Sequence, residues 1–220
     1  MKVISPFTGG TKMFEKRIDQ IVKRVFDIFL TLLLLLMLSP LLVAVALAIK
    51  LSSPGGIFFK QQRLGLHGKI FWMYKFRSMV ANAVHIGSGM FVEKDDPRIT
   101  RIGRILRKTD IDELPQLFNV LHGDMSLVGP RPAPLHHLEK YDKRQKKRLS
   151  VKPGLTGWAQ VNGRLALYWP ERIELDLWYV ANNSFWTDIR ILMKTITVVL
   201  CRRGETARED RKDVDPFMKL

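Results

Sequence analysis

The chain contains a pair of residues whose type and position favour chemistry, the adjacent carboxylates Asp112 and Glu113. They follow an arginine-rich stretch that includes Arg107, in a protein that is strongly basic overall. Such a pair can supply a nucleophile, a general base or the ligands of a divalent cation. The spacing of the two acids does not choose among these roles.

A helix is expected to begin at this pair, and two registers are possible. Asp110 and Glu113 match a capping box, but that register puts Pro115 at the fifth helical position, where its missing N–H interrupts the hydrogen bonds. With Asp112 as the N-cap, Pro115 takes the third position, where a backbone N–H has no helical partner anyway. We therefore predict a helix that starts at Asp112 and places both carboxylates at its positive end.

Arginines at constrained positions offer partners for phosphate groups. Arg131 stands between two prolines in GPRP, a stiff backbone that would hold one guanidinium in place, unless the segment is simply a tight turn. Arg164 ends the glycine-rich run KPGLTGWAQVNGR, whose glycines permit close approach to a ligand. Arginines also recur at every third position from Arg98 to Arg107, either as a solvated basic face or as forks that bind phosphates.

The elements that must position these residues include an uncharged apolar run from Ile28 to Ile49. About 20 apolar residues suffice to cross a bilayer as a helix, so this run is long enough to span. Ser39 and Pro40 interrupt it, because Pro40 cannot donate to the carbonyl of Leu36 and disfavours helical geometry at Ser39. The helix is therefore expected to kink or break there.

Three topologies fit this segment. It is a proline-kinked spanning helix, a re-entrant pair of half-helices that enters and leaves by one face, or a signal peptide, for which its apolar core and charged leader are too long. Each half has about ten residues, or roughly 15 Å of helix, which reaches only the middle of the bilayer. Basic residues flank both ends, at Lys23, Arg24 and Lys50, and favour two cytoplasmic ends. We expect the re-entrant form.

The rest of the chain divides by periodicity and composition. A basic amphipathic pattern from Phe14 onward predicts a helix in the headgroup plane, and two strand-like runs around LGLHG predict a β-hairpin. Further helices are predicted from Arg172 and over Phe185 to Leu200. The predicted fold is α+β, a membrane-embedded re-entrant helix plus a small helix-rich cytosolic domain with a short β-hairpin and interfacial amphipathic helices. Its parts are a flexible N-terminal tail (1–13), the amphipathic and re-entrant membrane helices (14–50), the cytosolic catalytic domain (51–200) and a charged C-terminal tail (201–220).

The charge of the chain calls for an anionic partner or surface. The formal net charge is +15 and the isoelectric point is about 10.1. Anionic lipid headgroups explain this charge most simply beside a membrane segment, and nucleic acid is the alternative. The single cysteine, Cys201, excludes an intramolecular disulfide and suits a reducing compartment.

Several long segments resemble the bacterial sugar transferases, also called monotopic phosphoglycosyl transferases. They are SPGGIFFKQQRLGLHG, KFRSM, DPRITRIGRILRKTDIDELPQLFNVLHGDMSLVGPRP and KPGLTGWAQVNGR, followed by a D-x-x-Y spacing at Asp176 and Tyr179. The resemblance covers about residues 20 to 200, although Thr109 to Ile111 replace the family's commoner Ser-Leu before the acidic pair. It implies the family's minimal form, without the N-terminal helices of larger members.

The resemblance implies that the chain transfers a sugar 1-phosphate from a UDP-sugar to undecaprenyl phosphate, releasing UMP and initiating a surface glycan. It implies that Asp112 is the nucleophile of a covalent aspartyl-phosphosugar intermediate, and that Asp112 and Glu113 bind Mg²⁺. It implies a membrane helix broken at Ser39-Pro40, on the cytoplasmic face of the bacterial inner membrane. The basic substrate contacts that it implies are Arg107, Arg131, Arg164, Lys75 and Arg77.

Two other classes of function fit parts of the sequence. A non-catalytic basic membrane adaptor would need the basic surface but not Asp112 and Glu113. A membrane-tethered nucleic-acid binder would bind DNA or RNA with a steep dependence on salt. Neither class explains the acidic pair, so we expect an enzyme without a nucleic-acid partner. The sequence indicates neither the sugar nor whether the chain acts as a monomer or a homodimer.

Overall fold

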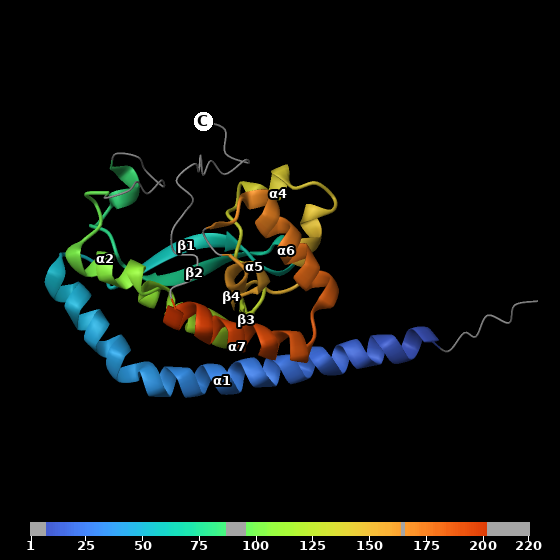
Figure 1. The fold of residues 1–220 in the computed structure, drawn as a ribbon. Coiled ribbons are helices and arrows are strands. Elements are labelled where there is room, and N and C mark those ends of the chain that lie inside the picture. The colour runs from blue at the N-terminus through green and yellow to red at the C-terminus, as the bar shows by residue number, and fades with distance from the viewer. Residues whose placement is uncertain (1–7, 87–95, 164–165, 202–220) are drawn as a thin grey trace, which may run out of the picture.

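The computed structural model describes residues 8–86, 96–163 and 166–201 of the chain (Figure 1). Its architecture is α+β and helix-rich, as the sequence predicted, with two small sheets and one long apolar helix at the N-terminal end. The helices are α1 (Thr8–Ser52), α2 (Arg101–Lys108), α3 (Gln116–His122), α4 (His137–Lys140), α5 (Trp158–Val161), α6 (Trp169–Asn182) and α7 (Phe185–Cys201). The strands are β1 (Phe58–Leu64), β2 (Ile70–Phe76), β3 (Ser126–Val128) and β4 (Gly154–Thr156).

The predicted β-hairpin is confirmed. Strands β1 and β2 pair antiparallel, from Phe58 opposite Phe76 to Leu64 opposite Ile70. His67 adopts a φ of 55° in the connecting turn. The hairpin is fixed to α3 by Asn119, which accepts a hydrogen bond from the Tyr74 N–H at 3.0 Å and donates to the Trp72 carbonyl at 2.7 Å. The end of β2 is thereby held beside the segment that carries the acidic pair.

The second sheet was not predicted. Strands β3 and β4 are three residues each and pair in parallel, with Ser126 opposite Gly154 and Val128 opposite Thr156. This pairing joins segments that are far apart in the sequence, and neither strand is long enough to show alternation. The sheet brings the GPRP segment and the glycine-rich run together.

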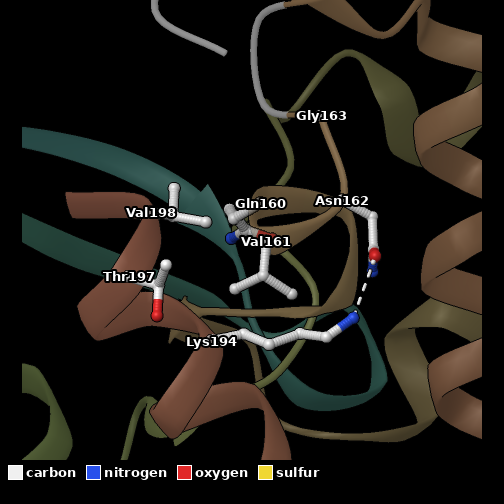
Figure 2. Close-up of a pocket in the computed structure, with 7 residues that line it drawn as sticks. All are labelled: Gln160, Val161, Asn162, Gly163, Lys194, Thr197 and Val198. Carbon is white, nitrogen blue, oxygen red and sulfur yellow. Dashed lines mark hydrogen bonds between the residues drawn. The ribbon is translucent and has the colours of Figure 1, made fainter. Parts of the chain in front are cut away.

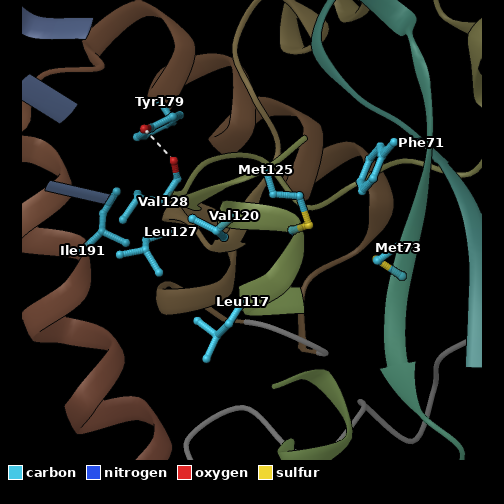
Figure 3. Packing of buried hydrophobic residues seen from close by; sticks show 9 residues of the cluster. All are labelled: Phe71, Met73, Leu117, Val120, Met125, Leu127, Val128, Tyr179 and Ile191. Carbon is cyan, nitrogen blue, oxygen red and sulfur yellow. Dashed lines mark hydrogen bonds between the residues drawn. The ribbon is translucent and has the colours of Figure 1, made fainter. Parts of the chain in front are cut away.

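The main hydrophobic core lies between the hairpin, α3, β3, α6 and α7 (Figure 3). Its buried members are Phe71, Met73, Leu117, Val120, Met125, Leu127, Val128, Tyr179 and Ile191. Residues from α1 pack against this core from outside, namely Leu30, Leu34 and Leu35. Helix α1 is therefore part of the domain's packing.

Helix α1 continues through Pro40 and bends part way along its length, as Figure 1 shows. Proline is the usual cause of a sharp bend in a helix. The carbonyl of Leu36, which loses its helical donor at Pro40, accepts a hydrogen bond from the Ser39 hydroxyl at 2.8 Å. Pro40 thus causes the bend, and Ser39 supplies the hydrogen bond that the Leu36 carbonyl loses. The helix begins at Thr8, within the segment that the sequence predicted as a tail (1–13).

Both arms of α1 contact the same domain. The arm after the bend buries Val45 and Ile49 against Phe76 of β2 and Leu106 of α2. The segment Ile18–Ser52 is long and apolar enough to be a candidate membrane span, and only 11% of its most apolar window is buried. A core helix of a soluble protein would be mostly covered, so this surface indicates membrane association.

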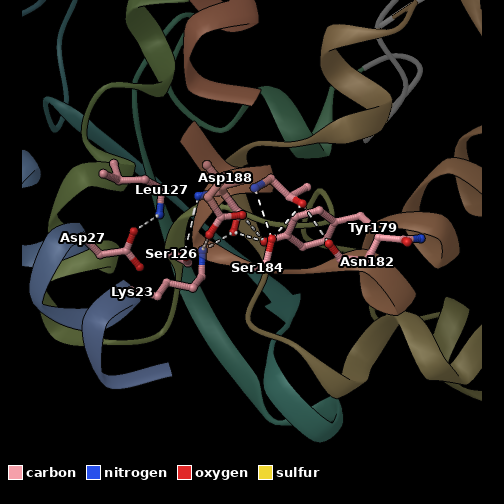
Figure 4. A network of polar contacts seen from close by, with 10 residues as sticks. Lys23, Asp27, Ser126, Leu127, Tyr179, Asn182, Ser184 and Asp188 are labelled. Carbon is pink, nitrogen blue, oxygen red and sulfur yellow. Dashed lines mark hydrogen bonds and ion pairs between the residues drawn. The ribbon is translucent and has the colours of Figure 1, made fainter. Parts of the chain in front are cut away.

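Basic residues before the apolar run bind the domain. Lys23 forms an ion pair with Asp188 of α7 and donates to the Val128 carbonyl at 3.1 Å (Figure 4). Arg24 donates to the carbonyls of Val120 and Leu121 at 2.6 and 2.8 Å. The sequence analysis counted both as membrane-flanking charges, whereas the structure uses them to fix α1 to the end of α3 and to α7.

Candidate active site

Asp112 and Glu113 lie in a 3-10 turn, Ile111–Glu113, between α2 and α3. The prediction of Asp112 as an N-cap is wrong, because α3 begins at Gln116 and its N-cap is Pro115. Asp110 adopts a left-handed conformation with φ of 55°, which turns the chain sharply after α2. The chain then continues in i to i+3 hydrogen bonds, from Glu113 N–H to the Asp110 carbonyl and onward, so the regular α-helix starts later than the sequence pattern suggested.

Both oxygens of Glu113 are occupied by cations from two other segments. Lys75, at the end of β2, donates to Oε1 at 2.7 Å. Arg131 donates to Oε1 at 2.6 Å and to Oε2 at 3.1 Å, a two-pronged contact. Burial would raise the pKa of Glu113, but Arg131 and Lys75 outweigh it and hold that pKa well below its usual range. Glu113 is therefore a permanent carboxylate whose charge is already neutralised.

Asp112 has a different environment. Its residue surface is 8% exposed, and within the part of the chain that the structure describes its carboxylate accepts no hydrogen bond. Burial raises the pKa of Asp112 to about 6, with Lys75 acting against this rise and the Glu113 charge adding to it. A carboxylate with little solvation and no donor is a better nucleophile than one that is saturated with hydrogen bonds.

Arg107, at the end of α2, acts on this site through its charge. It lowers the pKa of Asp112, although less than Lys75 does. Arg131 is itself stabilised as a cation, because the Glu113 carboxylate raises the pKa of its guanidinium. The structure thus brings three of the predicted substrate contacts, Lys75, Arg107 and Arg131, together around the acidic pair.

The backbone around Arg131 is held by the domain. The Gly154 N–H donates to the Pro130 carbonyl at 2.9 Å, and the Leu64 N–H donates to the Ala133 carbonyl at 2.9 Å. Arg148 donates to the carbonyl of Arg131 itself at 3.1 Å. With its carbonyl bound and prolines on both sides, Arg131 is fixed opposite Glu113.

Arg148 is a residue whose role the sequence analysis missed. It belongs to the basic run Lys140 to Arg148, yet it is buried and forms an ion pair with Asp176, which is also buried. Its other arm donates to the Tyr141 hydroxyl. The D-x-x-Y spacing that begins at Asp176 was the available signal, because a carboxylate on the inner side of α6 requires a cation partner.

The other predicted substrate contacts have different positions. Arg77 is buried and donates to the carbonyls of Ser53 and Pro54, each at 2.8 Å, so it fixes the end of α1. Arg98 precedes α2 and is buried in an ion pair with Asp96, so it does not belong to an exposed basic face. Arg164 lies outside the described residues.

The capacity of the site for Mg²⁺ can be judged from its oxygens. Within the described residues there is no group of three or more His, Cys, Asp and Glu side chains arranged for a metal ion. Mg²⁺ commonly uses one or two carboxylates together with substrate phosphates. Asp112 fits that pattern, whereas Glu113 would first have to release Lys75 or Arg131.

Comparisons with known proteins identify the family. The family model described as bacterial sugar transferase matches residues 18–202. An uncharacterized sugar transferase of Bacillus subtilis, EpsL, is 47% identical over 84% of this chain and 90% of its own length. An undecaprenyl-phosphate galactose phosphotransferase of Salmonella typhimurium is 46% identical over 86% of this chain.

A UDP-glucose:undecaprenyl-phosphate glucose-1-phosphate transferase of Escherichia coli is 43% identical over 81% of this chain. The chain spans 42% of the Salmonella relative and 40% of the Escherichia coli relative, so the similarity is to a part of each. The match nevertheless includes the acidic pair, the segments that hold it and most of α1. The chain belongs to the bacterial sugar transferase family and is a phosphoglycosyl transferase.

Proposed function

We propose that this enzyme transfers a sugar 1-phosphate from a UDP-sugar to undecaprenyl phosphate, giving undecaprenyl-diphospho-sugar and UMP. The Salmonella and Escherichia coli relatives are named as transferases that act on undecaprenyl phosphate, which supports the acceptor, and the Escherichia coli enzyme's name includes UDP-glucose, which supports a UDP-sugar donor. The observation that carries the proposal is that the two carboxylates of the acidic pair have different environments. Glu113 is saturated by Lys75 and Arg131, whereas Asp112 is buried and has no hydrogen-bond donor within the described part of the chain.

The reaction follows as two displacements at phosphorus. A carboxylate oxygen of Asp112 attacks the phosphorus that bears the sugar, and the bond to the bridging oxygen breaks. UMP leaves with the electron pair of that bond, and the sugar phosphate is then bonded to Asp112. In the second displacement a phosphate oxygen of undecaprenyl phosphate attacks the same phosphorus, which frees Asp112.

Glu113 has a positioning role in this mechanism. Two anions must approach each other, because a carboxylate attacks a diphosphate, and fixed cations reduce their repulsion. Glu113 holds Lys75 and Arg131 at the site, and Arg107 adds a third positive charge near Asp112. Because these groups come from β2, the GPRP segment and α2, the charge is in place before the donor binds.

Mg²⁺ is the proposed cofactor, as the family resemblance implies. Asp112 would hold it together with oxygens of the donor diphosphate. When bound, the ion neutralises phosphate charge and makes UMP a better leaving group. Glu113 contributes indirectly, through the cations that it already binds.

For α1 we propose a re-entrant topology, with both ends on the cytoplasmic face of the inner membrane. The bend at Pro40 and the packing of both arms on the same domain support it, because this packing keeps both arms beside one domain on one side of the bilayer. Helix α7 would lie in the interface beside α1, since Trp186, Met193 and Leu200 are exposed along it.

Cysteine labelling tests this topology. In a Cys201→Ser background, cysteines at Ser5 and Asp215 should both be protected from an impermeant reagent in intact cells. Labelling of the Ser5→Cys variant alone would show a spanning helix and contradict the proposal. Pro40→Leu should straighten α1 and favour a spanning form, which moves the N-terminus across the membrane.

Isotope exchange tests the reaction. Because the first displacement needs no acceptor, labelled UMP should exchange into the UDP-sugar with enzyme, Mg²⁺ and donor alone, and steady-state kinetics should be ping-pong. A panel of UDP-sugars, assayed for UMP release with undecaprenyl phosphate, would identify the sugar. Exchange that strictly requires undecaprenyl phosphate would mean direct attack by the lipid, and Asp112 would then not be the nucleophile.

A further inference from the structure

Lys152, just before β4, is partly buried and has no hydrogen bond or ion pair within the part of the chain that the structure describes. The other partly buried lysines have partners. Lys23 and Lys75 each pair with a carboxylate, and Lys194 donates to the Asn162 side-chain oxygen at 3.4 Å, beside the cavity between α5 and α7 (Figure 2). Because an ammonium group that loses water without gaining a partner costs free energy, Lys152 favours the binding of an anion from outside the chain.

Arg24 of α1 approaches the same point as Lys152. Both lie beside Gly123, the left-handed C-cap of α3, where an added Cβ would be 3.4 Å from Nη2 of Arg24 and 3.6 Å from Nζ of Lys152. Arg24 gives one N–H of each terminal nitrogen to the carbonyls of Val120 and Leu121, out of the five N–H donors of an arginine. Two cations with donors to spare therefore lie close enough for one phosphate group to contact both.

The nearby carboxylates do not neutralise these two cations. Asp27 is buried and accepts a hydrogen bond from the Leu127 N–H at 3.2 Å. Within the described residues, neither Asp27 nor Asp124 forms an ion pair with Arg24 or Lys152. Burial and the charge of Arg24 lower the pKa of Lys152, and they outweigh the opposing effects of Asp27 and Asp124. An anion between Arg24 and Lys152 would relieve their repulsion.

This pair of cations lies at the level expected for the membrane surface. Arg24 comes shortly before the apolar run that begins at Ile28. Phe26 packs edge-to-face on Phe185, with ring centres 5.3 Å apart, and the adjacent Trp186 is 77% exposed. Exposed tryptophans are typical of the boundary between membrane and water. The start of the apolar run lies at that boundary in a re-entrant helix and in a spanning one, so lipid headgroups surround Arg24 in either topology.

We infer that Arg24 and Lys152 bind the phosphate of an anionic membrane phospholipid, and that this lipid helps to attach the arm of α1 before Pro40 to the domain. Phosphate oxygens can accept hydrogen bonds from a guanidinium and an ammonium group at once. Phosphatidylcholine carries a phosphate too, but its cationic choline is repelled by the pair, whereas phosphatidylglycerol has a net negative charge.

The bound lipid is distinct from the acceptor substrate. Gly123 lies at the opposite end of α3 from the acidic pair, and a helix of seven residues is about 10 Å long. A phosphate held between Arg24 and Lys152 is therefore too far from Asp112 to react there. The inference depends on membrane association and is independent of the proposed reaction.

Native mass spectrometry of the full-length enzyme in detergent tests the site, by titration with phosphatidylglycerol and with phosphatidylcholine of the same acyl chains. Each basic residue contributes about fivefold to the affinity for an anionic lipid, so the native enzyme should bind one phosphatidylglycerol with about 30-fold preference. Lys152→Gln should reduce this preference about fivefold, whereas Lys152→Arg keeps the charge and should retain it. Lys146→Gln is the matched control and should behave as the native enzyme, because Lys146 is exposed in the segment Gln145–Ser150, which follows α4.

Thermal unfolding in detergent supplies a second measurement. Saturating phosphatidylglycerol should raise the Tm of the native enzyme and of Lys152→Arg more than that of Lys152→Gln, because a ligand that binds only the folded state stabilises it. The Tm without lipid should be nearly the same in all three, since Lys152 bonds to no other described residue.

Three outcomes would overturn the inference. One is an unchanged lipid preference in Lys152→Gln. Another is full displacement of the lipid by an equal concentration of glycerol 1-phosphate, which would indicate a site for soluble phosphates. The third is displacement by undecaprenyl phosphate together with a raised KM for that acceptor in Lys152→Gln, which would assign the site to the substrate. If UMP exchange fails but the lipid preference is found, the proposed function is wrong and the lipid site still stands.

Discussion

Two aspartates of this enzyme, Asp188 and Asp112, are both buried but differ in how many donors bind their carboxylates. Asp188 of α7 is 3% exposed, and Asp112 of the 3-10 turn before α3 is 8% exposed. Burial raises the pKa of both. Asp188, however, pairs with Lys23 through one oxygen and accepts a hydrogen bond from the Tyr179 hydroxyl at 2.7 Å through the other (Figure 4). Asp112 has no such donor in the described part of the chain.

The number of donors that bind a carboxylate, more than its burial, therefore decides whether its oxygens are available for reaction. The cluster of Lys23, Asp188 and Tyr179 joins α1, α7 and α6, and its hydrogen bonds attach α1 to the domain. At the candidate active site it is Glu113, the neighbour of Asp112, whose carboxylate is bound by cations, namely Lys75 and Arg131. The available cations are thus assigned to one carboxylate, and the other remains free to react.

The largest expected effect is on activity, when each aspartate is replaced by asparagine in turn. Asp112→Asn keeps the size of the side chain but removes the proposed nucleophile, so UMP exchange should fall by about 10³-fold or more. Asp188→Asn should keep most of the exchange rate per folded molecule, because Asp188 touches no reacting group. The measurement is labelled-UMP exchange, normalised to folded protein. Comparable losses in the two variants would show that Asp112 is only structural.

Removal of the cation from the Asp188 cluster should have the next largest effect, on stability. Lys23→Met keeps the aliphatic stem but leaves the Asp188 carboxylate buried with one donor. Breaking one side of a buried ion pair typically costs about 3 to 5 kcal/mol, and the partial exposure of Lys23 reduces this to about 3 kcal/mol. Denaturant unfolding in detergent measures it, and Lys50→Met, at an exposed lysine of the same helix, is the control. An unchanged unfolding free energy would mean that the ion pair contributes nothing.

Ionised Asp112 should lower the free energy of unfolding, whereas the Lys23–Asp188 pair raises it. The pKa of Asp112 is raised from 3.8 to about 6, so its contribution to stability is fully present below pH 3.8 and is lost as the pH rises through about 6. Asp112→Asn cannot ionise and should be more stable than the native enzyme by about 2 to 3 kcal/mol above pH 6. Thermal unfolding across this pH range, without divalent cations, measures the difference. Equal stability at all pH values would contradict the raised pKa.

The sequence predicted those parts of the fold that carry a local signal. The hairpin follows from two strand-like runs around the glycine-rich turn LGLHG, and the two C-terminal helices follow from helical periodicity, with α7 ending only one residue beyond the predicted Leu200. The sheet of β3 and β4 escaped prediction, because three-residue strands carry no period and their partners are distant. The N-cap at Asp112 was wrong because Asp110 takes a left-handed conformation that no spacing rule indicates.

The members of the candidate site could be predicted, but the roles of its two carboxylates could not. Residue types and the family resemblance selected Asp112, Glu113 and Arg131 from the sequence. Which carboxylate meets the cations depends on how the end of β2 and the GPRP segment approach the turn, and that is decided by tertiary packing. Arg98 and Arg148 show the same limit, since each belongs to a basic run yet is buried against a carboxylate.

The smallest predicted effect concerns the hydroxyl that completes the Asp188 cluster. Tyr179→Phe keeps the ring in the core but leaves one Asp188 oxygen and the Val128 carbonyl without this donor. The loss should be about 1 to 2 kcal/mol at neutral pH, the usual cost of an unpaired buried group.

The pH dependence of that loss distinguishes a hydrogen bond to a carboxylate from simple packing. The Tyr179 hydroxyl favours the ionised form of Asp188, so its removal raises the pKa of Asp188 further above the unfolded value. A group whose pKa is raised on folding destabilises the protein only once it ionises, so the loss in Tyr179→Phe should be largest at neutral pH and should shrink as the pH falls through the raised pKa of Asp188 toward 4. Unfolding free energies at pH 4 and pH 7.5 provide the measurement. A loss that is equal at both values would mean that Tyr179 acts through its ring alone, and the saturation of Asp188 would then depend on Lys23.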